Sequence, residues 1–157
     1  MTLTLIVENE YFLDWDSRFK GLFIMLKPSL PTLVDICIEY DIDGYGLSDA
    51  PLGGLCHELE KMVGQNVVET IELKITIEVG PGSINTQWGE LDDILMGSPE
   101  GWPALRKVFL RVDICGVSDN MDVSYEVAKE LRKSSMAKLM ESKRVQFDFQ
   151  AMVRMLL

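Results

Sequence analysis

The chain has little of what metal sites and many catalytic sites need. It contains one histidine and three cysteines, and its 15 lysines and arginines are outnumbered by 25 aspartates and glutamates. The cysteines are far apart and match no metal-ligand spacing, which argues against zinc and is typical of a reduced intracellular protein. The net charge of −10, without a basic cluster, argues against nucleic acid as a partner. We therefore expect no cofactor, no metal, and a cytoplasmic or nuclear location.

Long apolar runs are also missing. No window approaches the roughly 20 apolar residues needed to cross a bilayer, so we expect no membrane partner. The first twelve residues lack a basic region and have only a short apolar run, so they do not resemble a signal peptide. The length of 157 residues and the 47% hydrophobic content predict a single domain over 1–157, which could be a fragment of a longer array.

What the sequence does have is one pattern that recurs. In Ile71–Val79, IELKITIEV, apolar residues alternate with polar ones, which is typical of a strand with one dry face and one wet face. Similar alternation predicts further strands, and between them apolar residues at steps of three and four predict helices. The predicted strands cover 3–7, 34–42, 71–79, 108–114 and 145–150, and the predicted helices cover 15–26, 55–63, 88–95 and 121–131, with 134–143 leading into the last strand.

The charged residues within the strands indicate how the layers are arranged. Strands joined by helical crossovers are parallel, and a parallel sheet covered on both faces reads as a continuous apolar run. Here each unpaired charge would cost several kcal/mol if a second helical layer buried it. We therefore predict an α/β fold: a single-layered parallel sheet with helices on one face, like a leucine-rich-repeat solenoid of about four units of roughly 36 residues.

The polar face carries the candidate binding residues. The repeat spacing predicts that Glu39, Lys74, Arg111 and Asp148 lie side by side. One interpretation is a solvated face whose charges fix the strand register. The other is that Lys74 and Arg111, with Phe109, contact a partner. The candidate binding set is Glu39, Asp41, Lys74, Phe109, Arg111, Asp113 and Asp148.

Three segments, LKPSLPTLVDICIEYDI, GSPEGWPALRKVFLRVDI and WGELDDIL, resemble a known family. They are similar to the degenerate leucine-rich-repeat region that follows the F-box in expanded protein families of mushroom-forming fungi. The resemblance covers about 23–149. It implies a recognition surface for another protein, with no chemistry of its own, so we expect a non-enzymatic protein–protein interaction module.

The alternative is a compact α/β enzyme or ligand-binding protein with its site in the loops after strands two to four, at 41–54, 79–87 and 113–124. The glycine-rich stretch 44–49 has the context of a dinucleotide fingerprint, but Asp49 stands where the third glycine belongs. The single histidine, His57, follows Cys56 on a predicted helix, where neighbours point about 100 degrees apart and form no dyad.

Acidic residues at the carboxyl ends of strands offer one more possibility. Asp41, Asp43 and Asp113 could gather where α/β proteins usually place ligands, and carboxylate oxygens suit magnesium or calcium. The competing interpretation is that these are ordinary surface acids in an acidic chain.

The predicted end strands suggest self-association. Neither terminal repeat shows the polar cap that repeat arrays normally need, and exposed first or last strands invite pairing between chains. We expect a homo-oligomer that forms through a sheet edge.

Overall fold

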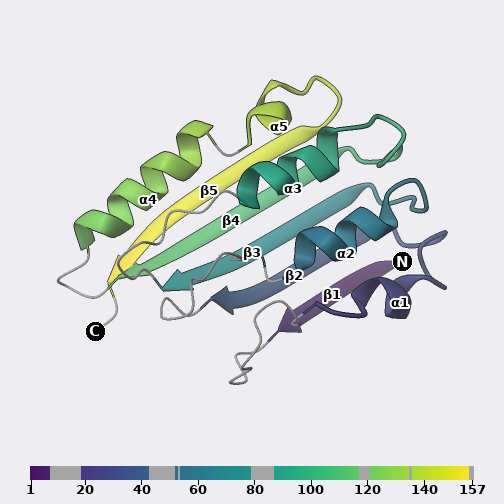
Figure 1. The fold of residues 1–157 in the computed structure, drawn as a ribbon, viewed down its shortest axis with the longest axis horizontal. Coiled ribbons are helices and arrows are strands. Elements are labelled where there is room, and N and C mark those ends of the chain that lie inside the picture. Colours follow the sequence, from purple (N-terminus) through teal and green to yellow (C-terminus); the bar gives the residue numbers. More distant parts are fainter. Residues whose placement is uncertain are drawn as a thin grey trace.

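A computed structural model describes most of the chain, namely residues 1–7, 19–42, 52, 54–78, 87–116, 121–134 and 136–155. This part forms one five-stranded sheet in which every pair of neighbours is parallel and the strand order equals the chain order (Figure 1). The strands are β1 (Thr2–Val7), β2 (Asp35–Ile42), β3 (Thr70–Glu78), β4 (Lys107–Gly116) and β5 (Gln146–Met155). The predicted α/β class is confirmed. Strand β5 runs beyond its predicted end at 150, because the alternation of side chains continues to Met155.

In the part of the chain that the structure describes, five helices lie between the strands. They are α1 (Leu22–Leu26), α2 (Leu55–Met62), α3 (Gln87–Met96), α4 (Met121–Ser134) and α5 (Ala137–Glu141). Gly64, with a φ of 72°, follows α2 at the predicted stop. Helix α5 lies inside 134–143, where no helix was predicted. Five residues are too few to show a helical period.

Figure 1 shows the helices on the same side of the sheet. The strand order explains why. Each crossover leads to the next strand in the same direction across the sheet, and crossovers of the same hand then put their helices on the same face. A doubly wound sheet would need a reversal of that order. Among the described residues there is no helix long and apolar enough to cross a membrane.

Burial follows the predicted alternation. On β3 the apolar residues Ile71, Leu73 and Ile75 are buried under the helices, whereas Glu72 and Lys74 on the other face are partly exposed. The same holds for β2 and β4, whose apolar residues join one continuous core with the helices. The edge strands β1 and β5 are less well covered, since Leu3, Leu5, Phe147 and Phe149 are only partly buried. Association through these edges stays a prediction.

The strand register confirms most of the predicted charged row. Glu39 is opposite Lys74, and Lys74 is opposite Arg111. The prediction for Asp148 is wrong, because Arg111 is opposite Gln150 and Asp148 is opposite Phe109. The connection between β4 and β5 holds two helices and is longer, so the spacing of paired residues rises from 37 (Lys74 to Arg111) to 39 (Arg111 to Gln150). A shift of two residues keeps Asp148 on the polar face but moves it along the strand.

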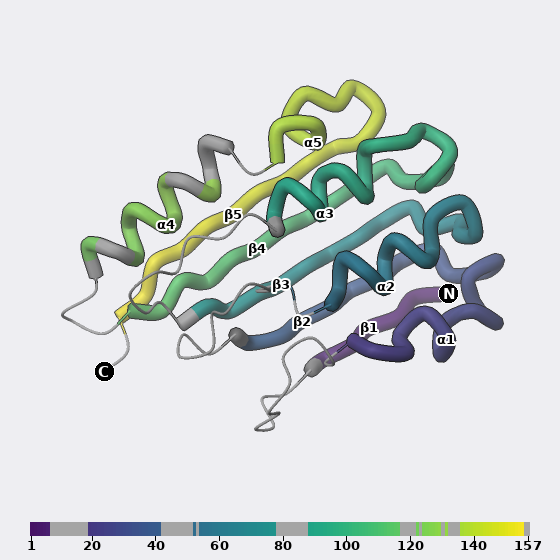
Figure 2. Tube along the Cα trace, viewed as in Figure 1, coloured from purple at the N-terminus to yellow at the C-terminus, as the bar shows by residue number. Residues whose placement is uncertain are grey.

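Two buried carboxylates tie neighbouring helices together. Glu58 on α2 accepts hydrogen bonds from the Phe23 amide of α1 at 2.8 Å and from Lys61 Nζ at 2.6 Å. Asp92 on α3 accepts hydrogen bonds from the Lys138 and Leu139 amides in the first turn of α5, at 2.8 and 2.9 Å. These amides have no partner within their own helix, so the carboxylates satisfy them. The trace in Figure 2 shows α3 beside α5 and α1 beside α2, which brings each pair into reach.

Candidate functional site

The sheet face opposite the helices, which we name the open face, holds all the candidate binding residues. Side chains alternate along a strand, and the parallel register aligns equivalent positions of neighbouring strands. As a result, every described charged side chain on the open face is exposed or partly exposed. These side chains belong to Asp35, Glu39, Asp41, Glu72, Lys74, Lys107, Arg111, Asp113, Asp148 and Arg154.

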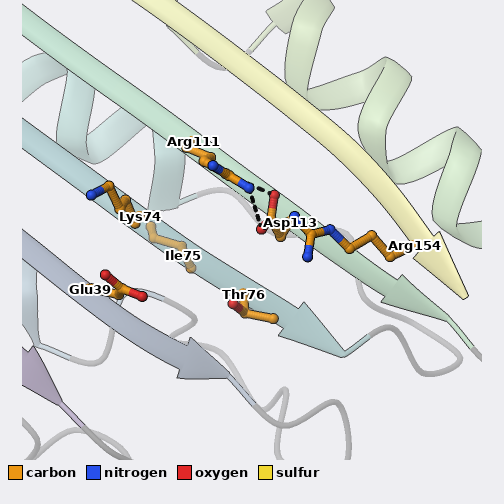
Figure 3. A pocket seen from close by; sticks show the side chains of 7 residues that line it. All are labelled: Glu39, Lys74, Ile75, Thr76, Arg111, Asp113 and Arg154. Atoms are coloured by element: carbon orange, nitrogen blue, oxygen red, sulfur yellow. Dashed lines mark hydrogen bonds and ion pairs between the residues drawn. The ribbon is translucent and has the colours of Figure 1, made fainter. Parts of the chain in front are cut away.

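A hollow of about 280 Å³ lies on the open face, across β2 to β5. Figure 3 shows its lining side chains, which come from four neighbouring strands. The lining residues are Glu39, Lys74, Ile75, Thr76, Arg111, Asp113 and Arg154. The hollow therefore combines three cations with two carboxylates.

Asp113 contacts two of the three cations that line the hollow. Its carboxylate accepts two hydrogen bonds from Arg111, Nε to Oδ1 at 3.1 Å and Nη2 to Oδ2 at 3.2 Å. The two residues are separated by two positions on β4, so their side chains share a face. Arg154 approaches from β5, with Nη2 3.3 Å from Asp113 Oδ2. The Asp113 side chain is only 17% exposed, and its carboxylate contacts two guanidinium groups.

The hydrogen bond and the negative charge of Asp113 raise the pKa of Arg111 further above its usual range. Lys74 pairs with Glu72 on its own strand, Nζ to Oε1 at 3.2 Å, and this hydrogen bond raises the pKa of Lys74. Both cations therefore keep their charge near neutral pH. They are opposite each other in the register, but the Lys74 side chain is directed to Glu72, toward the start of β3, and the Arg111 side chain to Asp113, toward the end of β4.

The predicted set divides between the hollow and its surroundings. Glu39, Lys74, Arg111 and Asp113 line the hollow. Asp41 is opposite Thr76, which is one of the lining residues. Phe109 is partly buried and opposite Asp148.

Asp148 belongs to a separate charged contact on the open face. It lies 3.7 Å from Lys107 Nζ and accepts a hydrogen bond from Gln146 at 2.9 Å. The predicted row placed Asp148 beside Arg111, where it would have neutralised the guanidinium charge. In the structure Asp148 does not do this. Asp113 does so instead.

Two lining residues, Arg154 and Thr76, were not among the predicted site residues. Thr76 belongs to the alternation of β3, but the predicted binding set was chosen from charged and aromatic side chains. Arg154 lies four residues after Gln150, where β5 was predicted to end. Continuing the alternation to Met155 would have placed Arg154 on the polar face, so a usable signal was present.

Most of the loop sites of the alternative hypothesis, including Asp43 and the segment 44–49, lie outside the described residues. Within the described ranges, no group of three or more histidine, cysteine, aspartate or glutamate side chains could hold a metal ion. His57 is exposed, whereas Cys56 is buried. Burial raises the pKa of the Cys56 thiol to about 12, so it stays protonated and unreactive near neutral pH.

Comparison of this chain with family models, with curated proteins and with solved structures gives no match. The likeness to leucine-rich-repeat regions of F-box proteins therefore stays a prediction.

Proposed function

We propose that this chain is a non-enzymatic protein-interaction module that binds another protein through its open face. The observation that carries the proposal is the contrast between the two sheet faces. One face is covered by helices, and the other leaves charged side chains of neighbouring strands in water. Uncovered side chains at fixed spacing are a suitable surface for a macromolecular partner.

The composition of the open face supports this proposal. Protein interfaces commonly place aromatic and arginine side chains at their energetic centre, surrounded by polar groups. Phe109 is beside Arg111 on the same face of β4, and acids such as Glu72 and Asp148 flank Phe109 in the register. Charges arranged in this way contribute mainly to specificity and to the rate of association.

We also propose that the fold is a leucine-rich-repeat-like solenoid. A sequential parallel sheet with helices on one side is the arrangement that a leucine-rich-repeat-like solenoid would have, and such solenoids bind partners over extended surfaces. In this proposal the chain works inside the cell, as its three widely spaced cysteines favour. The resemblance to regions that follow an F-box would make the partner a protein that the module recruits.

Site-specific photo-cross-linking tests the proposal. A photoreactive phenylalanine analogue replaces Phe109 on the open face, or Ile24, which is exposed on α1. In an extract of the native cells, we expect a discrete cross-linked protein from position 109 and not from position 24. The double variant Lys74→Glu with Arg111→Glu should abolish this product while circular dichroism still reports a folded chain.

The matched control reverses two exposed cations of the helical side, Lys27→Glu with Lys129→Glu. It makes the same change in net charge, and the cross-link should persist. Equal cross-linking from position 24, or a product that survives reversal of Lys74 and Arg111, would contradict the proposed surface.

A further inference from the structure

We propose that the hollow on the open face receives a single carboxylate side chain, Asp or Glu, of the protein partner. This inference rests on the proposed function and names the chemistry of its central contact. The candidate donors are Arg111, Lys74 and Arg154.

The first support is the supply of hydrogen-bond donors. A guanidinium group has five N–H donors in a fixed fork. Arg111 directs one N–H from Nε and one from Nη2 at Asp113, and Arg154 reaches the same carboxylate through Nη2. Each arginine thus retains donors that Asp113 does not use. Figure 3 shows Arg111 and Arg154 on either side of Asp113, with Lys74 on the adjacent strand.

The second support is that two cations, Lys74 and Arg111, are directly opposite each other on β3 and β4. Their ion-pair partners, Glu72 and Asp113, lie on their own strands, and Glu39 is opposite Lys74 on the other side, on β2, so none of these three acids lies between the two cations. A carboxylate placed between these cations would accept charge-assisted hydrogen bonds from Arg111 and, once the Lys74 side chain turns away from Glu72, from Lys74 as well.

The third support is the charge balance, which favours one carboxylate over a phosphate. The hollow is lined by three cations and by the carboxylates of Glu39 and Asp113, a net charge of +1. A single carboxylate balances that charge. A phosphorylated side chain carries a charge of about −1.5 to −2 at neutral pH. Its negative charge would exceed the net charge of the hollow and would be repelled by Glu39 and Asp113.

Asp113 acts in this arrangement as a positioning residue. Because it already holds both guanidinium groups, less side-chain freedom is lost when the ligand arrives.

The experiment titrates the isotope-labelled chain with short peptides and follows its NMR spectrum. The probe is acetyl-Gly-Glu-Gly-amide at millimolar concentration. The comparison probes are the isosteric acetyl-Gly-Gln-Gly-amide and acetyl-Gly-phosphoserine-Gly-amide. We expect saturable shifts at the amides of Lys74, Thr76 and Asp113 and at the side-chain Nε–Hε signal of Arg111 with the glutamate peptide, and none with the glutamine peptide.

Two matched variants locate the binding. Arg111→Gln should weaken the apparent affinity for the glutamate peptide by about fivefold or more, because a charge-assisted hydrogen bond is lost. Lys107→Gln removes the same charge from the same strand and face, but outside the hollow, and should change the affinity less than about twofold. The inference is overturned if the glutamate peptide causes no saturable shift, if both variants behave alike, or if the phosphoserine peptide binds more tightly.

Asp113→Asn separates positioning from charge. It makes the hollow more positive, so electrostatics alone predicts tighter binding of the glutamate peptide. A positioning role predicts weaker binding, together with an Arg111 Nε–Hε signal that moves toward that of a free arginine before any peptide is added. Tighter binding with an unchanged signal would contradict the role given to Asp113.

The outcomes also separate this inference from the proposed function. If cross-linking from position 109 succeeds and the glutamate peptide fails to bind, only the carboxylate inference falls. If the peptide binds and cross-linking fails, the proposed protein partner is contradicted, whereas the preference of the hollow for a carboxylate is supported.

Discussion

The two faces of the sheet are formed by the same strands, but they differ in the burial and the polarity of their side chains. Leu73 and Lys74 are consecutive residues of β3, yet Leu73 is 0% exposed under the helices and the Lys74 side chain is 36% exposed on the open face. The apolar face holds the fold together through burial. The open face adds little to that burial, and the role that we propose for its side chains is recognition.

Acidic residues show the same contrast. Glu58 and Asp92 are buried in the helical layer and accept hydrogen bonds from groups of neighbouring elements. Asp148 lies on the open face, in contacts that water can replace. Glu58 and Asp92 therefore stabilise the helical layer, whereas the Asp148 side chain is 42% exposed and contributes little to the fold.

The largest expected effect comes from truncating the apolar face at its centre. Leu73→Ala should lower the free energy of unfolding by about 2–5 kcal/mol, because it removes buried methyl groups and leaves a cavity. Lys74→Ala, one residue away on the open face, should change it by about 0.5 kcal/mol or less. Urea denaturation of both variants measures the difference. Similar losses of unfolding free energy would contradict the claim that the apolar face, and not the open face, stabilises the fold.

An intermediate effect is expected for Asp92, which is 4% exposed. Asp92→Ala should cost about 1–3 kcal/mol, because the buried amide of Leu139 and that of Lys138 lose their acceptor. The matched control is Asp93→Ala. The Asp93 side chain is 66% exposed, with an ion pair to Lys138, and this change should cost less than about 0.5 kcal/mol. Equal costs in thermal or urea unfolding would contradict the structural role of Asp92.

The smallest effect depends on pH and concerns Glu58. Burial opposes its ionisation, but hydrogen bonds from Lys61 and from the Phe23 amide outweigh burial, so the pKa of Glu58 is lowered from 4.5. A carboxylate with a lowered pKa in the folded state stabilises the fold above its unfolded pKa, and this contribution is lost as the pH falls through the folded pKa. The stability difference between the wild type and Glu58→Gln should therefore be greatest near pH 7 and shrink below pH 4.5.

Urea denaturation at pH 7, 5, 4 and 3 measures that difference. Glu60→Gln, which neutralises an exposed carboxylate on the same helix, is the control and should differ little from the wild type at pH 7. A gap for Glu58→Gln that grows as the pH falls would contradict the assigned sign.

Some parts of the site were readable in the sequence, and others were not. The strands, their dry and wet faces and the pairing of Glu39 with Lys74 and of Lys74 with Arg111 follow from local alternation and similar repeat spacing. The offset of Asp148 and the helix α5 do not, because they depend on a longer connection whose path has no periodic signal. The buried roles of Glu58 and Asp92 were also missed, since a charged residue on a helix looks solvent-exposed until a neighbouring helix is placed beside it.

The sequence by itself determined that this chain builds strands with one apolar and one charged face, because side-chain direction reverses at every residue of a strand. That alternation is a property of each strand alone and does not depend on which strands lie beside it. Only the tertiary structure decided that Arg154 joins Arg111 at Asp113, because the lateral register of β5 on β4 depends on how α4 and α5 occupy the connection and pack on the sheet. The hollow exists only after that register is set.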